Sequence, residues 1–302
     1  MIPCFDAARL ADRAPADLAD LAAAARGAGF LTVTGTAISS DELRALLGHY
    51  RGFFHRPRAV KAEVDMAATG SNRGWGGPRS ERVDPTANPD FKEVFDMGYT
   101  LPPGDPLAVY GRKYYAPNRW PEDMPAFRAA LEDYYTRASA VALDLLEVLA
   151  AALGMPEGYF ATRFDRPMAL LRSNWYPPRP DWAGSRDFGI APHTDYGCLT
   201  LLATDGAPGL EVQGPDGAWH PVAAAPGTFV VNFGEMLAMW TGGQVSATLH
   251  RVVGTERERL SVPLFFNPNY DTDVAPPGSA APILAGDHLS RRYDETYVHL
   301  TS

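Results

Sequence analysis

The chain has 302 residues, of which 46% are hydrophobic and 21% are charged, a composition typical of a packed globular protein. Its 27 basic and 36 acidic residues give a formal net charge of −9, and no block of lysines or arginines interrupts the sequence. This balance argues against nucleic-acid and anionic-membrane partners, so an anionic ligand has to be bound by individual arginines.

Cysteine content and the first residues indicate the compartment. Cys4 and Cys198 are the only cysteines, too few for a disulfide framework, and no C-x-x-C pair is present. The N-terminus lacks the layout of a signal peptide, and no apolar run approaches the ~18 residues of a membrane span. We therefore expect a cytoplasmic protein without membrane contact; the sequence leaves its oligomeric state open.

Residues 1–120 predict a mixed α/β segment. Helix formers over residues 15–28 predict a helix, and Phe30–Thr34 predicts a short strand. An apolar stripe at helical spacing predicts a second helix over residues 40–54. Residues 67–90 are rich in glycine, proline, serine and asparagine, which predicts a long loop with a functional role.

The strongest helix signal lies over residues 121–155. Pro121 is followed by Glu and Asp, which suit a first helical turn. Apolar residues keep helical spacing from Leu131 to Leu149, and Gly154 is suited to a C-terminal cap. We expect this helix to back a sheet, and a final helix over residues 283–300 to pack onto the same fold.

Residues 168–270 have a different texture, with short β-like runs separated by glycine, proline and aspartate. These runs are Ala169–Tyr176, Cys198–Ala203, Leu210–Gln213, Thr228–Phe233, Ala247–Val253 and Leu260–Asn267. Many short strands with turn signals are typical of a barrel or jelly roll. We expect a mainly β fold with helical decoration, forming one domain over residues 1–302.

Two histidines and an aspartate in this β-rich half form a candidate metal site. His193 and Asp195 are two residues apart, so on a strand both side chains face the same way, and Pro192 and Gly197 argue against a helix. His250 lies in another β-like run and can approach from a facing strand. Two histidines and one carboxylate leave the other face of an iron open, as in non-heme Fe(II) oxygenases.

A candidate anion clamp follows the metal motif. Arg259 and Ser261 share a strand face in an apolar run, and a buried arginine needs an anion. A guanidinium binds a carboxylate bidentately, and a serine hydroxyl adds a third hydrogen bond. Arg172, Asn174 and Tyr176 share a face of another predicted strand and suit an organic acid; the alternative is a polar, solvent-facing side of an edge strand.

The chain resembles the isopenicillin N synthase-like group of 2-oxoglutarate/Fe(II) dioxygenases over nearly its whole length. The matching motifs are Gly29–Gly35, Asn72–Trp75, Phe91–Asp96, Asn174–Pro178, His193–Gly197, Gly209–Gln213, Val231–Gly234, His250–Val252 and Arg259–Pro263. The resemblance implies a double-stranded β-helix core that holds Fe(II) through His193, Asp195 and His250. It implies that Arg259 and Ser261, helped by Tyr176, bind the far carboxylate of 2-oxoglutarate, and that Asn174 lines the co-substrate pocket. The implied reaction uses O2 to oxidise, most often hydroxylate, a C–H bond of a small molecule, with release of succinate and CO2.

Substrate contacts are expected from several further residues. Strand alternation from Arg259 places Phe265 inward, and Arg172 is suited to a substrate carboxylate or to support of 2-oxoglutarate. The loop residues Trp75, Arg79 and Glu81 are expected to cover the mouth of the site, together with Phe95, and Tyr196 adjoins the metal ligands. For the aromatic side chains, core packing is the competing interpretation.

Three other functions remain open at this point. They are an Fe(II)/O2 oxidase that works without 2-oxoglutarate, as isopenicillin N synthase does; an enzyme that fragments 2-oxoglutarate to ethylene; and a non-enzymatic jelly-roll sensor of an organic acid. An intact metal triad argues against the sensor, because sensing needs no open coordination positions. Succinate release that tracks O2 would separate enzyme from sensor.

Overall fold

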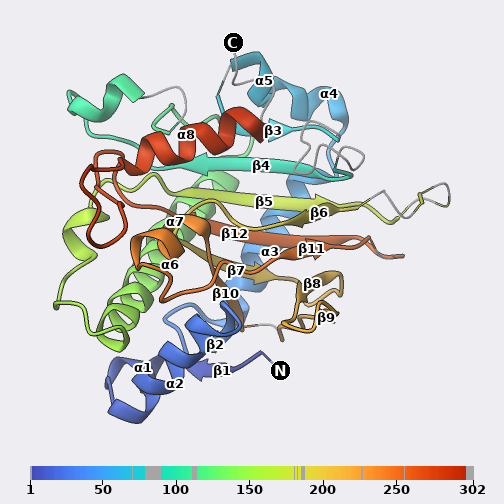
Figure 1. The fold of residues 1–302 in the computed structure, drawn as a ribbon. Helices are drawn as coiled ribbons and strands as arrows, with labels where there is room; N and C mark the ends of the chain where they lie inside the picture. The colour runs from blue at the N-terminus through green and yellow to red at the C-terminus, as the bar shows by residue number, and fades with distance from the viewer. Residues whose placement is uncertain are drawn as a thin grey trace.

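The computed structural model is built on two β-sheets with helices around them (Figure 1). It describes residues 2–69, 71–78, 90–110, 114–179, 181, 183–184, 188–225, 227–254 and 256–296. The larger sheet has the strand order β1 (Cys4–Asp6), β2 (Phe30–Thr34), β10 (Phe229–Phe233), β7 (Leu199–Thr204), β12 (Arg259–Phe266), β5 (Leu170–Tyr176), β4 (Glu93–Gly98) and β3 (Gly74–Gly76). The smaller sheet has the order β6 (Ile190–His193), β11 (His250–Val252), β8 (Leu210–Gln213) and β9 (Trp219–Pro221).

The inner faces of the two sheets meet in an apolar cluster. Phe30, Leu202 and Val230 of the larger sheet pack with Leu210 and Val252 of the smaller one. Antiparallel pairing and side-chain alternation along each strand direct one set of residues into this interior. The predicted jelly-roll core with helical decoration is therefore confirmed.

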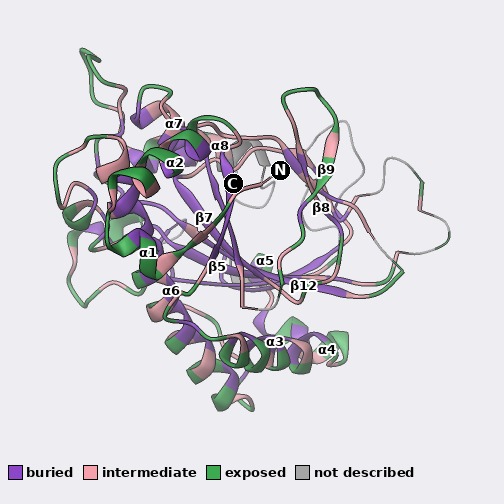
Figure 2. Ribbon diagram, turned by 90° about the horizontal axis from the view of Figure 1, so that it is seen from below, coloured by how far each residue is buried: buried purple, intermediate pink, exposed green. Residues whose placement is uncertain are grey.

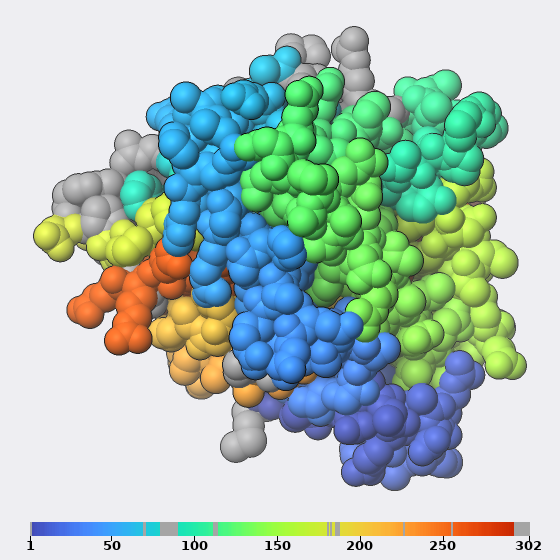
Figure 3. Space-filling model, turned by 180° about the vertical axis from the view of Figure 1, so that it is seen from behind, coloured from blue at the N-terminus to red at the C-terminus, as the bar shows by residue number. Residues whose placement is uncertain are grey.

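Helices cover the outer face of the larger sheet. Phe53 of α3 (Ser40–Phe54) and Phe127 of α6 (Pro125–Ala152) contact Phe95 of β4, with ring centroids 4.9 and 5.0 Å away. Figure 2 shows the buried side of α3 and α6 turned toward the strands, and Figure 3 shows the blue and green N-terminal half covering this side of the molecule. The remaining helical elements are α1 (Ala7–Ala11), α2 (Pro15–Arg26), α4 (Arg58–Lys61), α5 (Met66–Thr69), α7 (Glu235–Trp240) and α8 (Ala285–Thr296), with 3-10 turns η1 (Ala62–Val64), η2 (Pro106–Tyr110) and η3 (Ala161–Arg163).

The long backing helix α6 begins later than predicted. Pro121 starts a separate turn, in which the amide of Met124 donates to its carbonyl, and Pro125 is the first residue of the helix. Pro125 has no N–H to donate to Pro121, so a helix cannot run continuously through this point from residue 121. The other end agrees with the prediction, because Gly154 has a φ of +71° and the amide of Met155 donates back to Ala150.

The prediction of one long loop over residues 67–90 is wrong in its described part. Helix α5 extends to Thr69, and Gly74–Gly76 forms β3, in which Trp75 pairs with Phe95. Gly74 has a φ of +102°, and a Cβ there would lie 2.2 Å from the Val64 carbonyl oxygen. This glycine thus permits a close backbone approach rather than a loose loop.

The C-terminal helix α8 agrees with the predicted helix in its described part, which ends at Thr296. It is docked through its buried Ala285 and Leu289 and by hydrogen bonds from Tyr114 and Tyr270. No helix in the described ranges combines the length and hydropathy needed to cross a membrane.

Candidate active site

His193, Asp195 and His250 converge where β6 ends and β11 begins. The two histidines are direct register partners across the smaller sheet, and their ring centroids are 4.2 Å apart. Nε2 of His193 lies 3.8 Å, and Nε2 of His250 3.7 Å, from the same Asp195 carboxylate oxygen, Oδ1. The strand ends at His193, so Asp195 reaches the cluster from the segment that follows the strand rather than from the strand as predicted. Across the described chain, these three side chains form the one group of at least three potential ligands with donor atoms within 4.8 Å of one another.

Hydrogen bonds outside the cluster orient all three side chains. Nδ1 of His193 lies 2.8 Å from the Ala191 carbonyl oxygen, and Nδ1 of His250 lies 3.1 Å from that of Thr248. A carbonyl only accepts, so each Nδ1 carries the proton and each Nε2 lone pair faces the cluster. The histidines are therefore held in the tautomer that ligates a metal.

The carboxylate of Asp195 is held in a similar way. Its Oδ2 accepts hydrogen bonds from the Asn232 amide, at 2.6 Å, and from the Thr200 hydroxyl. This leaves Oδ1 as the oxygen that faces the two histidines. The sequence did not predict these roles of Asn232 and Thr200; the signal that it offered was a single polar residue, Asn232, in the otherwise apolar strand β10.

The protonation of the cluster suits a divalent cation. Burial, and then the neighbouring His250, lower the pKa of His193 to about 3, so this imidazole is neutral near pH 7. Burial opposes ionisation of Asp195, but the two histidines and the hydrogen bonds from Thr200 and Asn232 outweigh it and lower the carboxyl pKa. The donor set of two imidazoles and one carboxylate fits Fe(II) with positions left open for other ligands.

A buried guanidinium, two of whose nitrogens have no partner within the described ranges, lies in the same cavity. Arg259 and Ser261 of β12 are register partners of Tyr176 and Asn174 of β5, and all four line the cavity together with the histidine–aspartate cluster. Arg259 is 3% exposed, and its Nε and Nη1 atoms have no hydrogen-bond partner among the described residues. Its guanidinium carbon lies 5.1 Å from the centre of the Tyr176 ring. Buried guanidinium donors of this kind fit an incoming carboxylate, and Oδ1 of Asn174 is a second buried polar atom without a described partner.

Phe265 is the predicted substrate contact that lies in this cavity. It lines the cavity together with Pro263, as strand alternation from Arg259 predicts. Arg172 is not among the residues that line this cavity, and its guanidinium is bound bidentately by Asp96, at 2.8 and 2.6 Å. A substrate carboxylate would therefore have to compete with Asp96 for Arg172. Tyr196 is not among the cavity-lining residues. The guanidinium carbon of Arg292 lies over its ring, 4.5 Å from the ring centre.

The expectation that Trp75 and Phe95 cover the mouth of the site is not met. Both are at most 1% exposed and belong to paired strands, so alternation directs them to the helix-covered face of the sheet. The Trp75 indole donates to Glu93, whereas Phe95 packs among the core phenylalanines. Arg79 and Glu81, the other two predicted mouth residues, lie outside the described residues.

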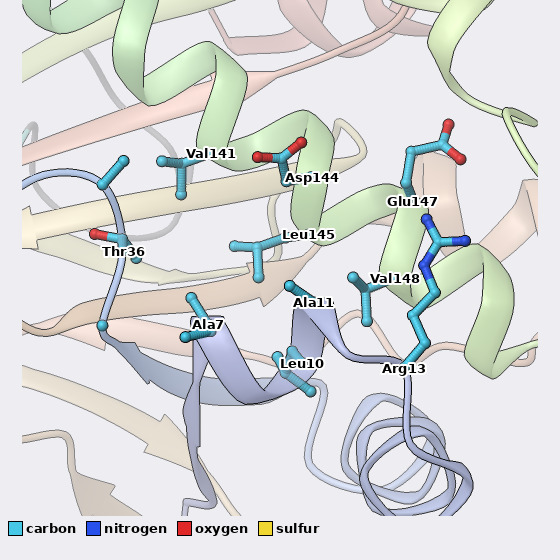
Figure 4. Close-up of a pocket in the computed structure, with 13 residues that line it drawn as sticks. Ala7, Leu10, Ala11, Arg13, Thr36, Val141, Asp144, Leu145, Glu147 and Val148 are labelled. Atoms are coloured by element: carbon cyan, nitrogen blue, oxygen red, sulfur yellow. The ribbon is translucent and has the colours of Figure 1, made fainter.

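A second cavity of about 440 Å³ lies between α1 and α6, on a different part of the molecule (Figure 4). Its walls are largely apolar, with Asp144, Glu147 and Arg13 at the edge. Glu147 accepts hydrogen bonds from the backbone amides of Gly158, Phe160 and Ala161, so it serves to cap the segment that follows α6. This cavity lacks the constellation of ligands and unpaired donors found at the histidine cluster.

Comparisons with known proteins agree with this geometry. The family model for the 2OG-Fe(II) oxygenase superfamily matches residues 167–268, and that for the non-haem dioxygenase in morphine synthesis N-terminal region matches residues 2–123. A 2-oxoglutarate-Fe(II) type oxidoreductase of Aspergillus fumigatus is 34% identical over 249 residues, which cover 80% of this chain and 74% of the relative.

Solved structures extend the similarity to the whole fold. A full-length Neurospora crassa protein, solved in complex with alpha-KG and thymine, superposes with a TM-score of 0.84 at 25% identity, covering 97% of this chain and 96% of that one. JOX2 in complex with 2OG, Fe and JA superposes with a TM-score of 0.77 at 27% identity, covering 96% of this chain and 85% of that one.

The fold and the metal-ligand cluster thus define a non-heme iron oxygenase. The chain belongs to the 2OG-Fe(II) oxygenase superfamily and is a 2-oxoglutarate-dependent Fe(II) dioxygenase.

Proposed function

We propose that His193, Asp195 and His250 hold the Fe(II), and that Arg259 and Ser261 hold the far carboxylate of 2-oxoglutarate. The strongest support is that two buried nitrogen atoms of the Arg259 guanidinium, in the cavity of the histidine–aspartate cluster, have no hydrogen-bond partner among the residues that the structure describes. A buried cation without an anion is costly, so a carboxylate ligand satisfies it. When bound, Fe(II) and 2-oxoglutarate together activate O2 and supply the oxidant for a C–H bond.

The protein contributes orientation and exclusion of water. Asn232 and Thr200 hold one oxygen of Asp195 so that the other faces the metal position. Tyr176 packs against the guanidinium of Arg259, and Asn174 lies beside Ser261, with its Oδ1 atom unpaired within the described part of the chain. Apolar side chains, among them Phe265, Pro263 and Leu202, line the cavity around Arg259, and such surroundings strengthen a carboxylate–guanidinium interaction.

The proposed reaction hydroxylates a small organic substrate. A substrate C–H, O2 and 2-oxoglutarate give the alcohol, succinate and CO2. Two relatives support a small-molecule substrate, because their structures hold thymine and JA respectively. A net charge of −9 also disfavours nucleic acid as the substrate. Cys4 and Cys198 are both free thiols, so we further propose a reducing, cytoplasmic location. We also propose that residues 1–302 form a single catalytic domain.

Succinate release tests this proposal. Protein loaded anaerobically with Fe(II) and 2-oxoglutarate should form succinate only after O2 is admitted, and His193→Ala should form none. Arg51→Ala is a matched control, since Arg51 pairs with Asp205 and Glu258 away from the cavity. If 2-oxoglutarate is neither bound nor consumed while O2 is still reduced, the assignment of Arg259 to 2-oxoglutarate is wrong. The clamp would then serve a substrate carboxylate.

A further inference from the structure

Thr194, which stands between two metal ligands, is hydrogen-bonded to a helix outside the cavity. Its hydroxyl donates to Oε1 of Glu235, the first residue of α7. The backbone repeats the connection, because the Glu235 amide donates to the Asp195 carbonyl at 2.8 Å. Glu235 therefore holds the segment Thr194–Gly197, which we call the metal-binding turn, through both its side chain and its main chain.

Close packing leaves this turn little freedom. A Cβ on Gly234 would lie 2.3 Å from the Gly197 carbonyl oxygen and 2.7 Å from that of Asp195. The Met236 amide donates to the Gly197 carbonyl at 3.1 Å. The start of α7 and the metal-binding turn thus form a rigid pair, so a change at Glu235 is transmitted to Asp195.

The same carboxylate also reaches the C-terminal helix. Nη2 of Arg292, on α8, lies 3.1 Å from Oε1 of Glu235, the oxygen that accepts from Thr194. The Arg292 guanidinium also covers the ring of Tyr196, which directly follows Asp195. Helix α8 is itself anchored, because the Tyr114 hydroxyl donates to the Gly286 carbonyl and a Cβ on Gly286 would lie 2.1 Å from the Tyr270 ring.

We propose that Glu235 is a positioning residue of the metal centre, which fixes Thr194 and, through Arg292, couples the metal-binding turn to α8. This inference rests on the proposed metal site. Glu235 does not line the cavity and is separated from the ligand atoms by Thr194, so it acts on ligand geometry rather than on the reacting atoms. Outer contacts of this type typically change metal affinity or activity about 10- to 100-fold when they are removed.

Cobalt(II) binding to the metal-free protein gives a readout that is independent of turnover, because the visible bands of Co(II) report ligand geometry. Thr194→Val and Glu235→Ala should weaken Co(II) binding on the order of tenfold and alter its bands. Thr194→Ser restores the hydroxyl and should restore wild-type binding. Arg292→Ala should weaken binding by roughly two- to fivefold, the range expected for a partly exposed ion pair.

A control separates positioning from general stability. Thr241 lies at the other end of α7 and donates its hydroxyl to the Leu237 carbonyl, away from the metal-binding turn. Thr241→Val should lower the melting temperature of the metal-free protein without changing the Co(II) bands. Equal effects of Thr194→Val and Thr241→Val on Co(II) binding would overturn the positioning role.

Failure of this inference is distinguishable from failure of the proposed function. If the wild type binds Co(II) in a manner that depends on His193, but Glu235→Ala binds it equally well with the same bands, Glu235 has no positioning role. If Thr194→Val does not fold, Arg292→Ala still decides the coupling to α8, since unchanged affinity and bands contradict it. If the wild type itself binds no Co(II), the proposed metal site is wrong.

Discussion

Arg259 gives the sharpest prediction, because its effects on ligand binding and on stability should have opposite signs. Arg259→Leu removes the two buried donor atoms that have no partner in the described chain. Each hydrogen bond between a charged donor and its acceptor contributes about 1.5–3 kcal/mol. Loss of two such bonds costs roughly 3–6 kcal/mol, so 2-oxoglutarate should bind about a hundredfold to ten-thousandfold more weakly.

In contrast to ligand binding, the free energy of unfolding of the ligand-free protein should not be lowered by Arg259→Leu. Arg259 is 3% exposed, and its guanidinium lies over the ring of Tyr176. This cation–π contact contributes about 0.5–2 kcal/mol to stability. Leucine removes a buried guanidinium that has two unpaired donors among the described residues, so the metal-free and ligand-free variant should be as stable as the wild type or more stable. Saturating 2-oxoglutarate should raise the melting temperature of the Fe(II)-loaded wild type and leave that of Arg259→Leu unchanged.

Two measurements check this reasoning. An anaerobic titration of the Fe(II)-loaded protein with 2-oxoglutarate follows the metal-to-ligand charge-transfer band, and thermal melts are recorded with and without 2-oxoglutarate. Arg251→Leu is the matched control, because Arg251 pairs with Glu211 and packs on Trp219 outside the cavity. If Arg259→Leu binds 2-oxoglutarate as tightly as this control does, the guanidinium is not the clamp.

Three further predictions concern other parts of the chain. Thr200→Val removes one of the two hydrogen bonds to Oδ2 of Asp195 and should weaken Fe(II) binding about tenfold in an anaerobic titration; unchanged affinity would argue against an orienting role. Gly48→Ala places a methyl group in open space within α3 and should raise the free energy of unfolding by about 0.8–1 kcal/mol in a denaturant titration, whereas a loss would show that the site is crowded. The hydrogen bond from Arg137 is the main reason why the pKa of Glu42 is lowered from 4.5 to about 2. Ionised Glu42 therefore stabilises the fold above pH 4.5, and this contribution is lost as the pH falls through about 2. The stability difference between the wild type and Glu42→Gln should therefore shrink over that pH interval, and a constant difference would refute the linkage.

The sequence alone determined the features that depend on short periodicities. Short β-like runs bounded by turn residues were enough to predict β2 and β8 with the bounds that the structure has, and helical spacing predicted α3. Chemical type and spacing were also enough to select His193, Asp195 and His250, whose donor atoms converge. These signals are local in the chain, and the metal-ligand prediction gained weight from Arg259 and Ser261, which follow on another predicted strand.

Only the tertiary structure decided which partner each polar side chain meets. Alternation placed Arg172 on an inner face, but its pairing with Asp96 depends on the register between β5 and β4. The sequence predicted Trp75 in a loop over the mouth of the site, whereas in the structure it pairs with Phe95 in β3 and is buried, with its indole donating to Glu93. The link from Thr194 through Glu235 to the C-terminal helix depends on how distant elements pack, which no short sequence period encodes.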